Sequence, residues 1–201
     1  MEEKDKAVED AISQLQKKYG KTAVLQMNED MRFEVESIST GCFSLDDVFG
    51  CGGIPKGRII ELYGEESSGK STLAMFLMAQ IQKNGGKAAL IDAEFAFDQE
   101  YAKNIGLDIG SLIVSQPDTL EEAVDVIQKL VMSNGIDIIV VDSVAAMVPK
   151  AELECEEILK DTMALQARLL GKALRILTGA VSKSNTVVIF INQLRDKIGT
   201  F

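Results

Sequence analysis

Eight consecutive residues, from Gly64 to Ser71, fit the phosphate-binding pattern G-x-x-x-x-G-K-[ST]. An apolar stretch precedes them and a helix-forming stretch, 72–80, follows, which is the strand, loop and helix context that this motif needs. Glycines let the backbone wrap a phosphate with its N–H groups, and the free amides at a helix start add partial positive charge. Lys70 would meet the β- and γ-phosphates, and Ser71 would hold Mg²⁺.

The motif therefore predicts ATP and Mg²⁺ binding, and the alternative is an ordinary Gly-rich turn with an exposed lysine. The predicted nucleotide-binding residues of this segment are Gly64, Glu65, Glu66, Ser67, Ser68, Gly69, Lys70, Ser71 and Thr72.

Polar residues at predicted strand ends supply the rest of the chemistry. Asp142 ends the apolar run 138–142 and is placed to hold Mg²⁺ together with Ser71, unless it only caps a turn. Glu94 follows the strand that ends near residue 92, where a carboxylate can orient or deprotonate an attacking water. An exposed loop glutamate is an equally simple interpretation. Gln193, after the strand 186–191, is able to hydrogen-bond the γ-phosphate and report its loss.

Strands and helices alternate along most of the chain. Strands are expected at 58–63, 87–92, 112–115, 138–142 and 186–191. Helices are expected after the phosphate loop, in a short segment capped by Asp98, from about 118 to 132 with Gly135 as the stop, and from Asp161 to about 181. This order predicts an α/β fold with a mainly parallel, doubly wound sheet that binds its ligand at the strand carboxyl ends.

The N-terminal region differs from this pattern. Residues 4–19 are expected to form a helix that stops at Gly20, and 22–38 contain a possible strand outside the main core. We expect residues 1–33 to be a small appendage that either caps its own domain or docks on a neighbouring subunit, and 34–201 to be the main domain.

Composition limits the classes of function. The chain has 201 residues, 46% of them hydrophobic, which suffices for one full core. It contains no histidine, which excludes His-based catalysis, and its three cysteines lack a C-x-x-C pair. No apolar run is long enough to span a membrane, and the first residues do not resemble a signal peptide, so we expect a soluble cytoplasmic protein. The net charge of −10 argues against general attraction to nucleic acids.

Several segments together resemble the RecA family of bacterial recombinases, and the likeness extends from the N-terminal helix to Phe201. The phosphate loop is one of them. The others are Ser39-Thr40-Gly41 with Ser44-Leu45-Asp46, Gly52-Gly53-Ile54-Pro55, Ile91-Asp92-Ala93-Glu94, Ser115-Gln116-Pro117-Asp118-Thr119, Val140-Val141-Asp142-Ser143, Pro149-Lys150-Ala151-Glu152 and Phe190-Ile191-Asn192-Gln193.

The resemblance implies a P-loop NTPase core and an ATP-dependent helical filament on single-stranded DNA. Such a filament pairs with homologous double-stranded DNA, exchanges strands during repair, and promotes self-cleavage of the repressor of the SOS response to DNA damage. It makes Lys70, Glu94 and Gln193 catalytic and Asp142 a metal residue. Asp98 and Tyr101 match adenine contacts, and Met163, Arg168, Arg175 and Arg195 match positions that bind DNA.

The chain departs from the family pattern in four places. Glu65 replaces a usual proline, and Phe95 replaces a frequent histidine. The first DNA-binding loop, about 155–163, is one residue longer and is flanked by four glutamates from 152 to 157, which do not suit a phosphate backbone. We also expect the sequence to stop inside the second DNA-binding loop, without the family's neighbour-reaching lysines.

Two other functions compete with the recombinase interpretation. A P-loop kinase that acts on a small molecule usually has an arginine-rich lid, and the arginines here are few and scattered. A non-catalytic ATP-binding or subunit-docking module is the other alternative.

Overall fold

The computed structural model describes residues 2–20, 23–24, 35–154 and 163–194. They belong to two compact units, 1–34 and 35–201, and each unit is considered by itself. The first unit contains the helix α1 (Glu2–Tyr19), which the sequence pattern predicted. Gly20 follows this helix with a positive φ of 98°, a conformation that glycine adopts without steric cost.

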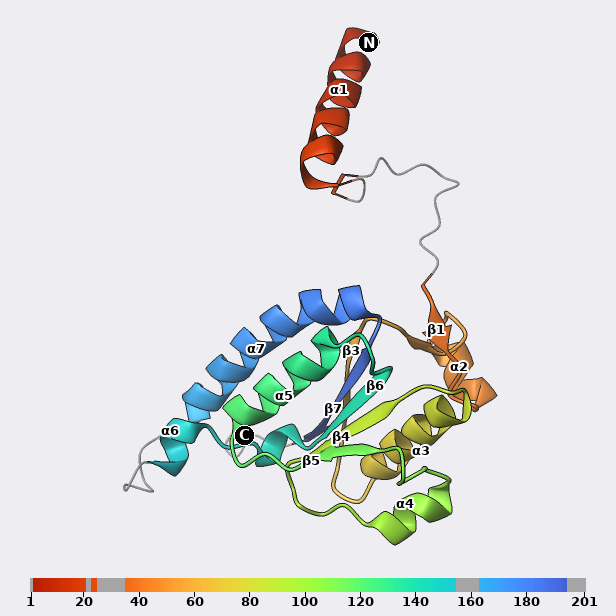
Figure 1. The fold of residues 1–201 in the computed structure, drawn as a ribbon, viewed down its shortest axis with the longest axis vertical. Coiled ribbons are helices and arrows are strands. Elements are labelled where there is room, and N and C mark those ends of the chain that lie inside the picture. Colours follow the sequence, from red (N-terminus) through yellow and green to blue (C-terminus); the bar gives the residue numbers. More distant parts are fainter. Residues whose placement is uncertain (1, 21–22, 25–34, 155–162, 195–201) are drawn as a thin grey trace, which may run out of the picture. The chain divides into compact units, whose positions relative to one another are not determined.

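A five-stranded parallel sheet forms the centre of the second unit (Figure 1). The strand order is β3-β7-β6-β4-β5. The strands are β3 (Ile59–Gly64), β4 (Ala88–Asp92), β5 (Ile113–Ser115), β6 (Ile138–Asp142) and β7 (Val187–Gln193). The inner strands consist largely of β-branched and other apolar residues, as strands covered on both faces do.

Helices cover both faces of this sheet. The helices α3 (Lys70–Lys83) and α4 (Gln99–Ile105) lie on one face, and α5 (Leu120–Met132) and α7 (Met163–Ser184) lie on the other (Figure 1). The prediction of an α/β fold with a parallel sheet flanked by helices is confirmed.

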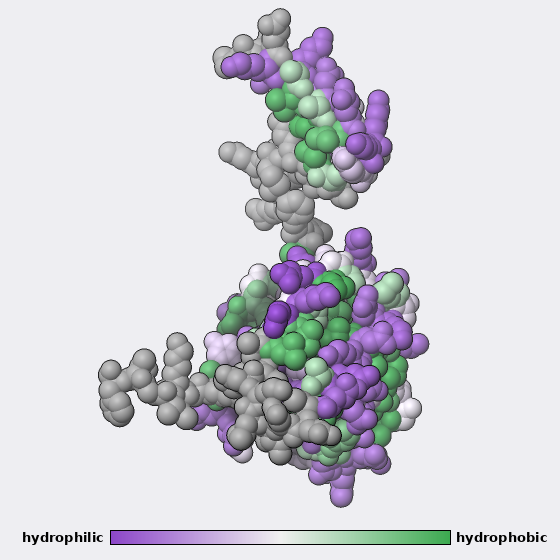
Figure 2. Space-filling model, turned by 90° about the vertical axis from the view of Figure 1, so that its left-hand side faces the viewer, coloured by the Kyte–Doolittle hydropathy of each residue, from purple (hydrophilic) through white to green (hydrophobic). Residues whose placement is uncertain are grey.

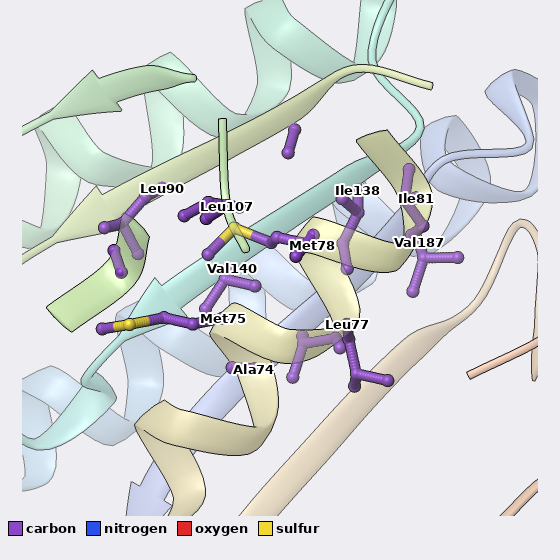
Figure 3. Close-up of a cluster of buried hydrophobic side chains, with 14 of the residues drawn as sticks. Ala74, Met75, Leu77, Met78, Ile81, Leu90, Leu107, Ile138, Val140 and Val187 are labelled. Carbon is purple, nitrogen blue, oxygen red and sulfur yellow. The ribbon is translucent and has the colours of Figure 1, made fainter. Parts of the chain in front are cut away.

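Two apolar clusters fix the helices to the sheet. Figure 3 shows the first, in which Met75 and Met78 of α3 pack against Leu90 and Val140 of the sheet. The second cluster joins α5 and α7 to the opposite face and includes the fully buried Ile127. Burying such a side chain contributes about 1.5–3 kcal/mol. The two clusters therefore hold the carboxyl ends of the strands in a defined arrangement.

Helix boundaries follow local capping interactions. The Asp98 carboxylate accepts hydrogen bonds from the amides of Glu100 and Tyr101, so its predicted capping of α4 is confirmed. Thr119 caps α5 by accepting from the Glu122 amide. The predicted end of α5 at about Met132 is confirmed, whereas its C-cap is Ser133 and not Gly135. Asp161, the predicted cap of α7, lies outside the described residues.

Short elements complete the second unit. They include the short helix α2 (Phe43–Val48). The strand β1 (Ser37–Ile38) lies within 22–38, the stretch expected to contain a strand outside the main core, and it pairs antiparallel with β2 (Ile54–Pro55). The strand β2, the 3-10 turn η1 (Val144–Ala146) and the helix α6 (Lys150–Leu153) were not predicted. Within the described ranges, no helix is both long and apolar enough to cross a membrane.

Candidate nucleotide-binding site

The predicted phosphate loop connects the end of β3 to the start of α3. Ser67 and Gly69 both have positive φ, of 57° and 87°, so the backbone turns sharply around the loop. No side chain caps the first turn of α3, which leaves its N–H groups pointing into the loop. This geometry provides the backbone donors and the helix dipole that bind a phosphate.

Lys70 is the first residue of α3, and its ammonium group lies over the loop. Its Nζ donates to the carbonyl oxygen of Gly64 at 3.0 Å and to that of Glu65 at 2.5 Å. The positive charge is thereby placed beside the loop amides, where a nucleotide phosphate would need a counter-charge.

One cavity is lined by half of the residues that the sequence predicted for ATP and Mg²⁺. Its volume is about 330 Å³, and residues at the carboxyl ends of β3, β4, β6 and β7 contribute to its wall. The lining residues are Glu66, Ser67, Lys70, Ser71, Glu94, Asp142, Ser143, Ile191 and Gln193. The parallel sheet thus brings together residues that are more than a hundred positions apart in sequence.

Asp142 is the carboxylate at the end of β6. Burial raises the pKa of the Asp142 carboxyl above its ordinary value, and the neighbouring carboxylates of Glu94 and Asp92 raise it further. A hydrogen bond with Ser71 and the charge of Lys70 act in the opposite direction. A half-buried carboxylate beside a hydroxyl is a donor set that fits Mg²⁺, which prefers oxygen ligands.

Glu94 is held by the end of β6. The Ser143 hydroxyl donates to Glu94 Oε1 at 2.5 Å, and the Asp142 carbonyl accepts hydrogen bonds from the amides of Ala93 and Glu94. Ser143 itself is almost fully buried, at 1% exposure. The sequence analysis assigned no role to Ser143, although its position directly after Asp142 at a strand end was a usable signal.

Gln193 ends β7 opposite Gly64 of the phosphate loop. The preceding residue, Asn192, donates from Nδ2 to Glu61 Oε1 at 2.9 Å, which ties the end of β7 to β3. Gln193 is half-buried in the cavity wall, so its amide is positioned beside the loop.

Asp98 and Tyr101 do not line this cavity. Asp98 uses its carboxylate to cap α4, and the Tyr101 hydroxyl lies 3.0 Å from the Thr72 hydroxyl on α3. Tyr101 is therefore adjacent to the helix that follows the phosphate loop, whereas contact of either residue with a base stays a prediction.

The residues predicted to bind DNA belong to α7 and to the segment after β7. Arg168 and Arg175 are exposed on α7. Met163 is the first residue of that helix, and nothing is described of its side chain. Arg195 lies outside the described residues. The Gln166 side chain donates to the carbonyls of Val144 and Met147, which fixes the start of α7 beside the end of β6.

Comparison with known proteins agrees with this architecture. The family model described as the RecA N-terminal domain matches residues 6–201. The chain is 54% identical over 198 residues to Protein RecA of Clostridium tetani, a match that covers 98% of this chain and 56% of that protein. It is 56% identical over 198 residues to Protein RecA of Chloroherpeton thalassium, covering 98% of this chain and 55% of the relative. The chain therefore spans a little over half the length of these relatives, and it belongs to the RecA N-terminal domain family.

Proposed function

We propose that this chain is the nucleotide-binding part of an ATP-dependent, DNA-dependent recombinase. The observation that carries the proposal is the convergence of Lys70, Glu94 and Gln193 on one cavity, in a chain that is 54% identical to a protein named RecA. The geometry suits hydrolysis of a nucleoside triphosphate. The similarity to RecA favours recombination and repair of DNA over phosphate transfer to a small molecule.

ATP and Mg²⁺ fit the residues that line the cavity. The loop amides and Lys70 would bind the phosphates, and Ser71 with Asp142 would hold the metal ion. When bound, Mg²⁺ would neutralise negative charge on the β- and γ-phosphate oxygens. The raised pKa of Asp142 supports this assignment, because burial keeps a carboxylate here costly until a cation accompanies it.

Glu94 is the residue that would accept a proton from the attacking water. Its carboxylate faces the same cavity as Lys70, and Ser143 limits where it can point. A carboxylate in this position orients the water and takes its proton as the bond to phosphorus forms. Gln193, from β7, would contact the γ-phosphate and pass its loss to the segment that follows.

DNA binding is proposed for the start of α7 and the segments next to it. Arg168 and Arg175 are exposed and would contact phosphates, and Met163 and Arg195 are the other two positions proposed to contact DNA. Because the chain carries a net charge of −10, this local patch must act against a repulsive background, and binding should be weak at high salt. The nucleic acid would be single-stranded DNA, followed by a homologous duplex.

Self-association is proposed for the first unit. Figure 2 shows an apolar stripe along α1 between polar side chains, and Val8 and Leu15 on this helix are 55% and 40% exposed. An amphipathic helix with an open apolar face is suited to docking on a neighbouring subunit of a filament. The division into 1–33 and 34–201, the co-protease role towards the damage-response repressor and the cytoplasmic location belong to the same proposal.

ATP hydrolysis with and without single-stranded DNA tests the proposal, measured in the chain joined to the C-terminal portion of a RecA relative. In this extended chain we expect turnover that DNA stimulates at fixed salt, and none that depends on a small-molecule acceptor. Acceptor-dependent transfer of the γ-phosphate would support the kinase alternative instead. Tight binding of Mg-ATP without any turnover would support a non-catalytic module.

A further inference from the structure

Asp92 is a buried carboxylate whose only effect described so far is to raise the pKa of the Asp142 carboxyl. It is the last residue of β4, two positions before Glu94, and it is 3% exposed. Three donors surround it. Its Oδ1 accepts from the Ala96 amide at 3.2 Å, and its Oδ2 accepts from the Phe97 amide at 3.2 Å and from Gln116 Nε2 at 2.9 Å.

The sheet register brings Gln116 to Asp92. Ile91 of β4 pairs with Ser115 of β5, so the residues that follow them leave the sheet side by side. Asp92 then lies in the wall of a small cavity of about 90 Å³, together with the apolar Leu90 and Val140 and with Ser71, Glu94 and Asp142 of the proposed site. A carboxylate in such surroundings is stable only when hydrogen-bonded, and Gln116 supplies its one side-chain partner among the described residues.

These bonds fix both ends of the short loop that carries Glu94. At the first end, the Asp142 carbonyl accepts from the Ala93 and Glu94 amides at 2.8 and 3.3 Å. At the second end, Asp92 accepts from the amides of Ala96 and Phe97. Phe95, between them, has a positive φ of 55°, which a non-glycine residue adopts only where its surroundings impose it.

We propose that Asp92 and Gln116 are positioning residues that hold the loop of Glu94 in its reactive position. This inference rests on the proposed role of Glu94 as the proton acceptor. Neither side chain lines the phosphate-loop cavity, so the pair acts on the hydrolysis step through loop geometry and leaves the phosphate contacts intact.

Three variants of the whole chain test the pair. In Gln116→Glu, a second carboxylate faces the Asp92 carboxylate and no longer donates a hydrogen bond to it. In Asp92→Asn, the new amide NH₂ faces N–H donors that have lost an acceptor. In the double variant Asp92→Asn/Gln116→Glu, the new amide at position 92 can donate to the new carboxylate at position 116, so one donor again faces one acceptor. Gln128→Glu, a partly exposed position on α5 away from the loop of Glu94, is the matched control for the change from amide to carboxylate.

Single-turnover hydrolysis of Mg-ATP and its dissociation constant are measured for each variant. Each single variant should hydrolyse roughly 10- to 100-fold more slowly, because small misplacements of a catalytic group cost that much. In Gln116→Glu the affinity for Mg-ATP should stay within about twofold of the unchanged chain, since no phosphate or metal contact is removed. The double variant should be less impaired than the product of the two single effects, because the two residues interact directly.

Hydrogen exchange of the amides of residues 93–97 provides a second readout that does not need turnover. Exchange should rise in both single variants and fall back in the double variant. Unchanged exchange and unchanged turnover in Gln116→Glu would overturn the inference, and so would an equal loss of Mg-ATP affinity and rate. In the chain extended with the C-terminal portion of a RecA relative, turnover that does not respond to DNA, but falls with Gln116→Glu, would contradict only the recombinase proposal.

Discussion

Asp142 is a carboxylate that the fold half-buries in the company of two other carboxylates. Its raised pKa means that the ionised form is disfavoured in the folded chain until a cation approaches. In our proposal, the Mg²⁺ ion that Asp142 would bind offsets this cost.

Replacing Asp142 by Asn should separate these two effects. In EDTA at neutral pH the variant should melt at a higher temperature than the unchanged chain, because a half-buried charge has been removed. In Mg²⁺ the variant should lose the metal-dependent part of its ATP affinity. Thermal melts and calorimetric titration measure both effects, with the exposed Asp125→Asn as the control. A lower melting temperature in EDTA would show that the carboxylate is stabilising.

Lys70→Ala should abolish useful ATP binding. The loop amides and the start of α3 remain in this variant, but they leave the charge of the β- and γ-phosphates poorly neutralised. Calorimetry with Mg-ATP measures the loss, and Lys129→Ala, on an exposed part of α5, should bind as the unchanged chain does. Retained micromolar affinity in Lys70→Ala would contradict the assignment.

Glu94→Gln should separate binding from chemistry. The amide keeps the size of the side chain but cannot take a proton, so hydrolysis should slow by at least ~100-fold while ATP affinity stays nearly unchanged. Turnover in a chain extended with the C-terminal portion of a RecA relative is the measurement, with the exposed Glu36→Gln as its control. Unchanged turnover would show that another group positions the water.

At the scale of elements, Asp46 holds residues 39–46, which precede β3, together by hydrogen bonds. The family resemblance of Ser39-Thr40-Gly41 and Ser44-Leu45-Asp46 did not indicate this structural role. Asp46 of α2 accepts hydrogen bonds from the Ser39 hydroxyl and from the amide and hydroxyl of Thr40, all between 2.6 and 2.7 Å. These bonds, first of all that of Ser39, hold the pKa of Asp46 below its usual value of 3.8.

The lowered pKa gives the Asp46 interaction a defined pH dependence. Its contribution to stability is complete above pH 3.8 and is lost as pH falls through the lower pKa of the folded state. Asp46→Asn should therefore be less stable than the unchanged chain at pH 7 and pH 5, with a difference that shrinks only below about pH 3.8. Urea unfolding at each pH measures this difference. The adjacent exposed Asp47→Asn should show none, and an Asp46→Asn deficit that persists unchanged at pH 3 would contradict the mechanism.

The elements themselves were largely predictable, whereas several contacts between them were not. Runs of β-branched residues predicted β6 and β7, and the chemistry of caps predicted the start of α4 at Asp98. The pair of Asp92 with Gln116 depends on β4 lying next to β5, and the contact of Ser143 with Glu94 depends on β4 lying next to β6. Local patterns predict strands but do not give their order in a parallel sheet, so these partners became visible only in three dimensions.

At the scale of the whole molecule, the turn after β6 connects the phosphate-loop cavity to the start of α7. Gln166 links the start of α7 to the turn after β6, and Ser143 in that turn holds Glu94. The chain nevertheless covers only 56% of the relative from Clostridium tetani, and its net charge of −10 opposes DNA binding.

The last prediction concerns the activity of this chain taken by itself. The family resemblance implies that lysines from a neighbouring subunit complete the ATP site, and we expect those residues to lie beyond the region that this chain shares with its relatives. The 201-residue chain should therefore bind Mg-ATP but hydrolyse it very slowly, and it should bind single-stranded DNA weakly.

Joining the C-terminal portion of a close RecA relative should recover ATP hydrolysis and DNA binding together, because Gln193 would couple nucleotide state to the DNA-binding segments. ATP turnover of both chains, each with and without single-stranded DNA at fixed salt, is the measurement. Glu94→Gln in the extended chain is the control for hydrolysis at this site. Strong DNA-stimulated turnover by the 201-residue chain alone would mean that one subunit holds a complete site, which would contradict a site shared between subunits.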